Sequence, residues 1–360
     1  MSLTTVDAGL LGTQAQYTGF KNRIINGAMM IDQRNAGLPV TPTSSAYTVD
    51  RWQLYVSQAS KLSAQQNAGT ITPPTGFRNY LGFTSLSAYS VTSSDAFQLG
   101  QAIEGFNIAD LGWGAAGAQS VTLSFWVRSS LTGTFGGALI NSAGNRSYPF
   151  TYAISSANTW EKKTIIIPGD TSGTWLTDNG QGINVRFSLG VGATFSGTAG
   201  AWAAGTFVSA TGATSVVGTN GATFYITGVQ LEKGSTATSF DYRPYGTELA
   251  LCQRYLPCYN ATSASTQTLC SGFAATTTIV RAVYPLKVNP RVPPTGVTVS
   301  SAAHFNFGGA GTAPSAITFE TGSIDACSLQ LATTGATVGA GSYLYSTSAS
   351  AQIQFTGCEL

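Results

Sequence analysis

The chain has 360 residues, of which only 9% are charged while 43% are hydrophobic and 42 are glycine. Disordered chains are rich in charge and poor in aromatic residues, so an aromatic content of 11% argues against disorder. The net charge is +2 and no basic cluster is longer than Lys162-Lys163, which argues against binding nucleic acid through its phosphates. No apolar run approaches the roughly 18 residues that span a bilayer. A surface made of uncharged polar residues and glycine suits an oligomer or an extracellular protein rather than a cytosolic metabolic enzyme.

Residues 1–20 show no clear hydrophobic period, and three glycines interrupt them, so we expect an extended N-terminal arm. From Phe20 to about Tyr245, short apolar stretches alternate with Gly, Ser, Asn and Asp every ten or so residues, which is typical of a β-sandwich or barrel. The clearest predicted strands are Ser120–Arg128, Lys163–Pro168, Ile183–Leu189 and Thr223–Leu231. In the first of these, a period of two places Val121, Leu123, Phe125 and Val127 on one face.

One helix is predicted, over Thr247–Leu256, with Thr247 as its N-cap and Pro257 as its end signal. Short strands resume afterwards, for example Thr276–Tyr284 and Ala351–Phe355. The sequence therefore predicts an all-β chain with four parts. These are an arm at 1–20, a large β domain at 21–245, a helical connector at 246–257 and a smaller β-sandwich-like domain at 258–360.

Several motifs resemble a family of jelly-roll domains in phage tail and fibre proteins, which are similar to carbohydrate-binding modules. The opening of the family is matched by Phe20–Arg34 (FKNRIINGAMMIDQR) and Tyr47–Trp52 (YTVDRW), and its end by Ile226–Gly234 (ITGVQLEKG) and Phe240–Tyr255 (FDYRPYGTELALCQRY). Further on, 284–295 (YPLKVNPRVPPT) and the terminal GCEL resemble a C-terminal module that often follows. That second match departs from the family at Val288-Asn289, where Met-Arg is usual, and at the end, where the family has Ala-Glu-Leu.

The resemblance implies a jelly-roll β-sandwich in a structural virion protein of a bacteriophage, of the tail-fibre or receptor-binding type. Such a protein would be a homotrimer that docks on other virion proteins through its arm and recognises host surface polysaccharide without catalysis. The N-terminus has no positive n-region or apolar h-region, so we expect assembly in the bacterial cytoplasm and release by lysis rather than secretion. The alternative is a capsid decoration or tail-adaptor protein that binds no ligand.

Sugar rings stack on flat aromatic side chains, and two tryptophans lie in glycine-rich loops where such stacking is expected. These are Trp113, in Gly112-Trp-Gly114, and Trp202, in 200–205 (GAWAAG). Packing of both rings against a neighbouring subunit is the alternative. The turn-rich stretches Asn260–Thr268 and Gly308–Ser315 favour a different location for recognition, in the second domain.

By the same resemblance, a structural Ca²⁺ is expected near the paired first and last strands of the jelly roll. The candidate ligands are Asp32, Asp50, Glu232 and Asp241; otherwise these acids pair with Arg34, Arg51 and Arg243. No other cofactor is expected.

Catalysis is not expected, because the chain has a single histidine, His304, in an apolar-rich strand. Glu104 and Asp110 are the acid pair that a glycan-cleaving enzyme would use, and this is the most distant alternative. All five cysteines fall in the last third of the chain and form no CxxC pair. We expect buried free thiols; one disulfide formed late is the alternative.

Overall fold

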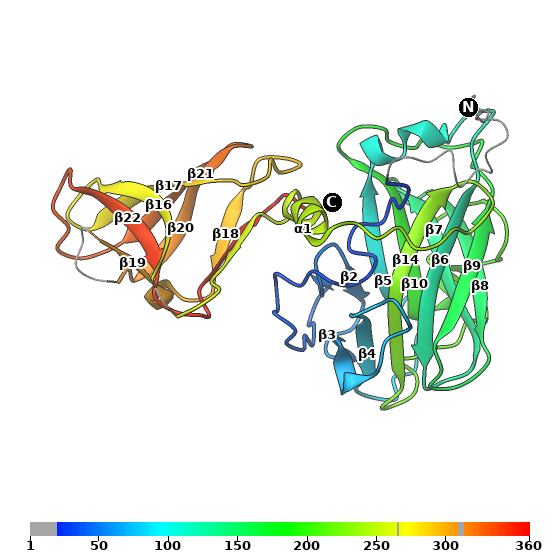
Figure 1. Ribbon diagram of the computed structural model, residues 1–360. Helices are drawn as coiled ribbons and strands as arrows, with labels where there is room; N and C mark the ends of the chain where they lie inside the picture. Colours follow the sequence, from blue (N-terminus) through cyan, green and yellow to red (C-terminus); the bar gives the residue numbers. More distant parts are fainter. Residues whose placement is uncertain (1–19, 265, 309–312) are drawn as a thin grey trace, which may run out of the picture. The chain divides into compact units, whose positions relative to one another are not determined.

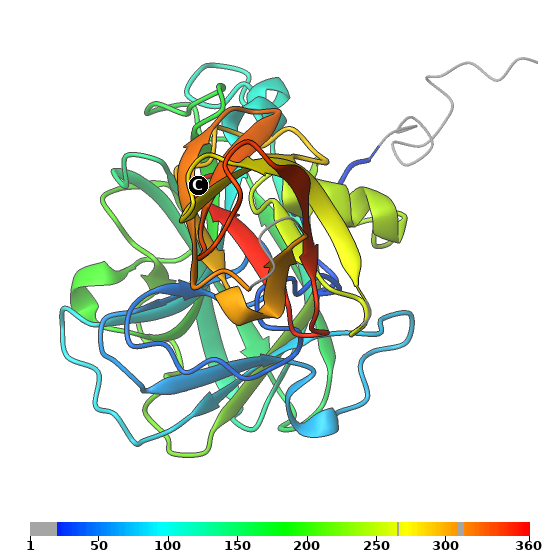
Figure 2. The ribbon, with the colours of Figure 1, turned by 90° about the vertical axis from the view of Figure 1, so that its left-hand side faces the viewer.

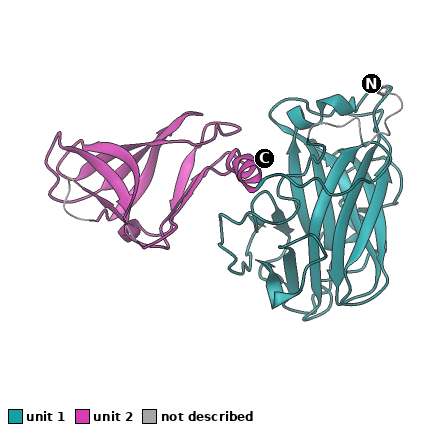
Figure 3. Ribbon diagram, viewed as in Figure 1, with its two compact units in different colours: residues 1–244 teal, residues 245–360 magenta. Residues whose placement is uncertain are grey.

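The computed structural model describes residues 20–264, 266–308 and 313–360, so the predicted arm lies outside the described residues except for Phe20. The chain divides into two compact units, residues 1–244 and residues 245–360 (Figure 3). Nearly all regular structure in both units is β, which confirms the predicted all-β class. No helix among the described residues is long and apolar enough to cross a membrane.

The first unit is a sandwich of two antiparallel sheets (Figure 1). In spatial order, the seven-stranded sheet contains β1 (Ala46–Tyr47), β2 (Gln53–Val56), β5 (Ala96–Glu104), β10 (Gln181–Val191), β7 (Gly133–Asn141), β8 (Arg146–Ile154) and β12 (Ala203–Ala204). The five-stranded sheet contains β3 (Leu62–Gln66), β4 (Leu81–Ser85), β14 (Thr223–Lys233), β6 (Val121–Ser129) and β9 (Glu161–Ile167). A short parallel pair, β11 (Ser196–Gly197) and β13 (Ser209–Ala210), lies in the long connection between β10 and β14.

The core of this unit fills the space between the two sheets, and the alternation of apolar residues builds it. The four β6 residues predicted to share a face, Val121, Leu123, Phe125 and Val127, are all fully buried. Strand β10 buries Ile183, Val185, Phe187 and Leu189 in the same way. The rings of Phe125 and Phe187 meet edge to face with centroids 5.0 Å apart, which joins the two sheets across the core.

The first described residues belong to this unit and lie against its last long strand. The side-chain oxygen of Asn22 accepts the backbone N–H of Leu231 at 3.1 Å, and the Asn22 amide donates to the Val229 carbonyl at 3.1 Å. Gly27 approaches the same strand so closely that a Cβ on it would lie 2.1 Å from the Val229 carbonyl oxygen. The opening and closing motifs of the sequence are therefore one structural element that ties the ends of the unit together.

The second unit, coloured yellow to red in Figure 2, has its own core between two antiparallel sheets. Its six-stranded sheet contains β19 (Phe305–Phe307), β22 (Gly341–Ser346), β16 (Gln267–Ala274), β17 (Ile279–Pro285), β21 (Ala326–Ala332) and β20 (Ala316–Gly322). The three-stranded sheet contains β15 (Cys258–Asn260), β23 (Gln352–Thr356) and β18 (Gly296–Val299).

The helix α1 (Tyr245–Gln253) belongs to the second unit and starts two residues before the predicted N-cap. Thr247 is therefore inside the helix, and the predicted role of Thr247 as N-cap is wrong. Pro244 precedes the first helical residue, and the fixed φ of proline suits a helix start better than a cap further along. Glu248 lies in the first turn, where its charge is favourable to the helix dipole.

Candidate functional site

A cavity with a partly polar lining lies on the first unit, on the face of the seven-stranded sheet that points away from the core. It has a volume of about 290 Å³, close to the lower end of ligand pockets in proteins. Strands β2, β5, β7 and β10 and the segments around residues 195 and 206 supply its lining. We call this cavity the sheet groove.

Strand alternation decides which β10 side chains reach the sheet groove. Because Ile183, Val185 and Phe187 point into the core, Asn184 and Arg186 point to the opposite face. Register places Arg186 between Gly100 of β5 and Ala138 of β7. A Cβ on residue 100 would lie 2.7 Å from Cδ of Arg186, so the glycine leaves the space in which the arginine side chain lies.

The guanidinium of Arg186 lies over the ring of Tyr55, with its central carbon 3.4 Å from the ring centroid. Burial lowers the pKa of Arg186, and the neighbouring Tyr55 offsets part of this change. An arginine nevertheless keeps its proton in a protein, so the sheet groove contains a permanent positive charge.

Several polar atoms around the sheet groove are buried and have no hydrogen-bond partner among the described residues. They are Nε and Nη1 of Arg186, Oδ1 of Asn184 and Oε1 of Gln98. Asn184 is 1% exposed and Gln98 is 7% exposed, although both line the cavity. Buried polar groups in folded proteins are nearly always paired, so these donors and acceptors are available to ordered water or to a polar ligand.

An apolar wall stands beside these polar groups. It is formed by Phe195 and Val208, which lie in the long connection after β10, and by Ile140 of β7. The backbone N–H of Val208 donates to the carbonyl of Phe195 at 2.8 Å, which holds the two sides of the connection together. A site with an apolar surface next to amide and guanidinium groups matches a sugar, which has apolar C–H faces and hydroxyl edges.

The structure does not place the two candidate tryptophans in this groove. Trp113 is 8% exposed, and its indole N–H donates to the Gln119 carbonyl at 2.7 Å. It packs edge to face against Trp175 and Trp202, with centroids 4.7 Å and 5.3 Å away. The Trp113 ring is therefore folded into the core of the first unit rather than exposed.

Trp202 is partly buried in the same cluster, which we call the tryptophan cluster (Trp113, Trp175 and Trp202). Its indole N–H donates to the Pro168 carbonyl at 2.8 Å, and its ring packs on Tyr148. Both tryptophans therefore have partners inside the first unit that account for their position.

The four candidate calcium ligands are not brought together. Among the described residues, no three acidic, histidine or cysteine side chains gather as a metal site would require. Each of the four carboxylates instead accepts hydrogen bonds from different protein groups: Asp32 from the amides of Asn35 and Gly37, Asp50 from Gln33, Glu232 from Thr238 and Gln230, and Asp241 from the amides of Lys21 and Asn22. These residue types can bind calcium, but here their carboxylates are hydrogen-bonded to neighbouring protein groups.

The acid pair named for glycan cleavage also lies outside the sheet groove. Glu104 is buried at 2% exposure, and Asp110 forms ion pairs with Arg23 at 2.8 Å and with Lys233 at 3.5 Å. Nδ1 of His304 and the Ser300 hydroxyl are hydrogen-bonded at 2.9 Å. Of the loops predicted to carry recognition in the second unit, residues 265 and 309–312 lie outside the described residues.

Sequence reasoning missed Arg186, Asn184 and Gln98. Arg186 and Asn184 lie within the predicted strand Ile183–Leu189, where alternation assigns them to a solvent-facing side, and nothing in the sequence shows what covers that side. The one available signal was Gly100, because a glycine inside a strand often marks a close approach of another group.

No protein-family model and no curated protein sequence matches the chain. Among solved structures, it is similar to the enzymatically active domain of bacteriophage CBA120 tailspike protein 4, with 12% identity and a TM-score of 0.33 over 59% of this chain. The matched region spans 21% of the tailspike chain. It is also similar to the carbohydrate-binding module TmCBM61 in complex with β-1,4-galactotriose (11% identity, TM-score 0.30, 59% of this chain and 99% of the module). A third match is the family 11 carbohydrate-binding module of a Clostridium thermocellum cellulase (14% identity, TM-score 0.27, 55% and 99%).

Proposed function

We propose that the protein binds a carbohydrate in the sheet groove and releases it unchanged. The observation that supports this most directly is the combination of unpaired amide and guanidinium groups with an apolar wall in one cavity. The amide side chains of Gln98 and Asn184 would exchange hydrogen bonds with sugar hydroxyls, while Phe195 and Val208 contact an apolar face of the ring. Binding in this way needs no group that breaks a bond.

Asn184→Ala tests the proposal, because it removes a groove amide without changing the core face of β10. A panel of purified bacterial surface polysaccharides is titrated into the wild type, the variant and a control, Asn220→Ala, in which an exposed turn residue is changed. We expect the groove variant to bind at least tenfold more weakly and the control to bind as the wild type does. Equal binding by all three proteins would contradict a site in the groove, and release of reducing sugar would contradict binding without catalysis.

We propose further that the chain is a virion protein of a bacteriophage of the tail-fibre or receptor-binding type. The sequence motifs at both ends of the first unit support this, as does a surface with few charges. The protein would assemble in the bacterial cytoplasm, leave the cell on lysis and dock on the virion through residues 1–20. Deleting residues 1–18 is expected to leave the melting temperature unchanged and to abolish incorporation into particles; incorporation without these residues would contradict the docking role.

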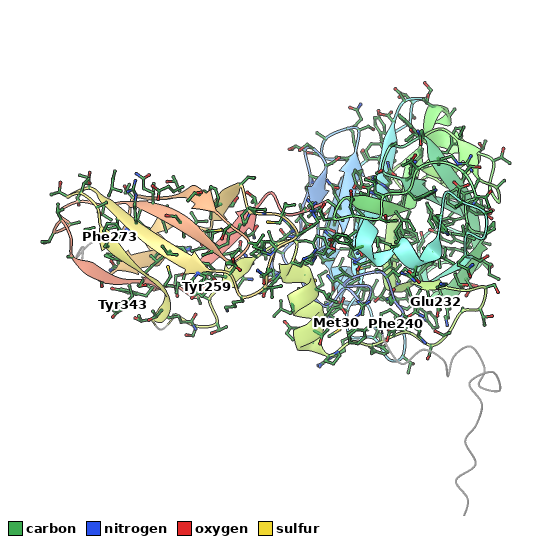
Figure 4. All side chains as sticks on the ribbon, turned by 90° about the horizontal axis from the view of Figure 1, so that it is seen from above. Met30, Glu232, Phe240, Tyr259, Phe273 and Tyr343 are labelled. Atoms are coloured by element: carbon green, nitrogen blue, oxygen red, sulfur yellow. The ribbon has the colours of Figure 1, made fainter. Side chains whose placement is uncertain are left out.

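A second candidate function, subunit packing without a ligand, is favoured by one surface of the second unit. Phe273 of β16 is 50% exposed, Val283 of β17 is 56% exposed and Tyr343 of β22 is 46% exposed. Ser271 of β16 pairs with both Val283 and Tyr343, so these apolar groups lie on neighbouring strands of one sheet; Figure 4 labels Phe273 and Tyr343. An exposed apolar patch of this kind is typical of an interaction surface.

We assign this patch to the contact between subunits in the homotrimer that the sequence leads us to expect. Light scattering of the wild type and of Phe273→Ser with Tyr343→Ser tests it. Loss of the trimer in the double variant, with unchanged polysaccharide binding, would show that packing and recognition are separate. A wild type that is monomeric at micromolar concentration would contradict the assignment.

A further inference from the structure

The sheet groove contains one charged residue, and that residue is positive. Of all the side chains that line the cavity, Arg186 alone carries a charge, and none of the described lining residues is Asp or Glu. The other polar lining groups are neutral amides and hydroxyls, which bind sugars of any charge. Any selection by charge in this groove therefore depends on Arg186.

Arg186 differs from Arg146 and Arg23 of the first unit in what compensates its charge. Arg146 forms an ion pair with Asp170 at 2.5 Å, and Arg23 forms one with Asp110 at 2.8 Å. At Arg186, the partner is the π face of Tyr55, and Nε and Nη1 have no hydrogen-bond acceptor among the described residues. A cation–π contact is weaker than a paired carboxylate, so much of the cost of desolvating this guanidinium is not recovered within the protein.

The neighbours of Arg186 fix where the guanidinium lies. Gly100 and Ala138, its register partners, are the small residues that let the side chain lie along the sheet surface. Tyr55 then supports one face of the planar group. A guanidinium held in this way presents its N–H groups in a fixed plane, which is the geometry that recognises a carboxylate through two parallel hydrogen bonds.

We propose that the sheet groove selects an acidic saccharide, whose anionic group pairs with Arg186 while Gln98 and Asn184 bind neighbouring hydroxyls. The proposal rests on the carbohydrate-binding function proposed above and specifies its ligand class. A carboxylate of a uronic acid and a sulfate ester share the chemistry that a guanidinium recognises, so the experiment treats them in separate arms.

Polysaccharides that differ only in the anionic group test the proposal. Alginate, polygalacturonate and hyaluronate are compared with their carboxyl-reduced derivatives, and dextran sulfate is compared with dextran. We expect the wild type to bind at least one acidic polymer tenfold or more tighter than its neutral counterpart, and this preference to weaken as NaCl rises. If a uronate polymer binds tighter than its carboxyl-reduced form, the group that pairs with Arg186 is a carboxylate. If dextran sulfate binds tighter than dextran, that group is a sulfate ester.

Arg186→Gln is expected to lose the preference, so that it binds each acidic polymer no tighter than the neutral counterpart. Arg186→Lys, which keeps the charge but not the planar fork, is expected to retain only part of it. The matched control is Arg128→Gln, because Arg128 also lies over a tyrosine, 5.5 Å from the Tyr225 ring centroid, but outside the groove. This control is expected to behave as the wild type, and circular dichroism checks that each variant is folded.

Two results would overturn the proposal: no acidic polymer binds better than its neutral counterpart, or the preference persists in Arg186→Gln. In both cases, neutral polymers that still bind through Asn184 would leave the carbohydrate-binding function standing. If no polymer of either kind binds to the folded wild type, both the binding function and the acidic ligand are contradicted.

Discussion

The side chain of Asn22 is hydrogen-bonded to the backbone of Leu231, a residue 209 positions later in the chain. The Asn22 side chain is 4% exposed and also binds the Val229 carbonyl and the Ile24 amide. One buried amide group thus satisfies three backbone groups from two distant segments. The opening motif of the sequence is thus held to β14, the last strand of the first unit, by hydrogen bonds.

Asn22→Ala is expected to lower the free energy of unfolding of the first unit by about 2 kcal/mol, because it leaves buried backbone groups without partners. Denaturant unfolding followed by tryptophan fluorescence measures the change. Asn220→Ala, at an exposed turn, is the control and is expected to change the stability by less than about 0.5 kcal/mol. A similar loss in both variants would show that the Asn22 contacts add nothing specific.

Gly100→Ala is expected to weaken polysaccharide binding about tenfold while the protein stays folded. The added Cβ would lie 2.7 Å from Cδ of Arg186 and 3.1 Å from the Val185 carbonyl oxygen, so the arginine side chain must move from its place in the groove. Isothermal titration gives the affinity and thermal unfolding gives the stability. Gly246→Ala is the matched control, because nothing lies within 4 Å of a Cβ at that position. Unchanged affinity in Gly100→Ala would show that the position of Arg186 is unimportant.

Asp95 is expected to make the first unit sensitive to acid. Burial alone would raise the pKa of Asp95, but hydrogen bonds from Thr92, Tyr89 and Ser57 outweigh it and hold the pKa well below its usual range. A carboxyl group with a lowered pKa in the folded state stabilises the protein above its ordinary pKa of about 4 and loses that contribution as the pH falls further.

The melting temperature of Asp95→Asn should therefore depend less on pH below about 4 than that of the wild type. Near pH 7 the variant should already be less stable. Asn220→Ala serves as a control at an exposed position without a titratable group and is expected to keep the wild-type pH profile. Parallel profiles for Asp95→Asn and the wild type would contradict the role of this carboxylate.

The five cysteines are free and buried, so the folded protein is expected to resist thiol reagents. Burial raises the pKa of Cys270 to about 12, of Cys327 to about 11 and of Cys358 to about 12, which suppresses the reactive thiolate at pH 8. Titration with a disulfide reagent should give less than one equivalent in buffer and five in denaturant. Three equivalents in denaturant without reductant would reveal one disulfide.

Trp113→Ala is expected to lower the free energy of unfolding by about 3–5 kcal/mol, because it removes one of the three mutually packed rings of the tryptophan cluster. The polysaccharide affinity of the fraction that folds should stay within twofold of the wild type. Trp113→Phe, which keeps an aromatic ring, should recover part of the stability. A folded Trp113→Ala protein that cannot bind polysaccharide would show that Trp113 is needed for binding.

The sequence predicts the strands of this protein better than the surface that they form together. Alternation along β6 identifies Val121, Leu123, Phe125 and Val127 as core residues, and all four are buried. The same rule says only that Arg186 faces the other way. Its place between Gly100 and Ala138 depends on strand order and register, and these are set by pairing between segments about 50 to 90 residues apart. The predicted helix start was wrong for a local reason, because the helix begins at Tyr245, directly after Pro244, and Thr247 lies inside its first turn.

The candidate calcium ligands show a different limit. Asp241 is close to the first described residues, as the resemblance implied, but its carboxylate binds the amides of Lys21 and Asn22. Side-chain type and approximate location could be inferred, whereas the partner of each carboxylate depends on the loop conformation. Residue type alone does not distinguish a metal ligand from an acceptor of backbone N–H groups.

The contact between Asp241 and the amides of Lys21 and Asn22 also has a mechanical consequence. It brings the point where the chain enters the first unit next to the point where the chain leaves it. A pulling force applied between the flanking segments would therefore act first on this junction, and the strands that build the sheet groove would lie outside the path of tension. The groove is therefore expected to keep its shape under a load that loosens this junction.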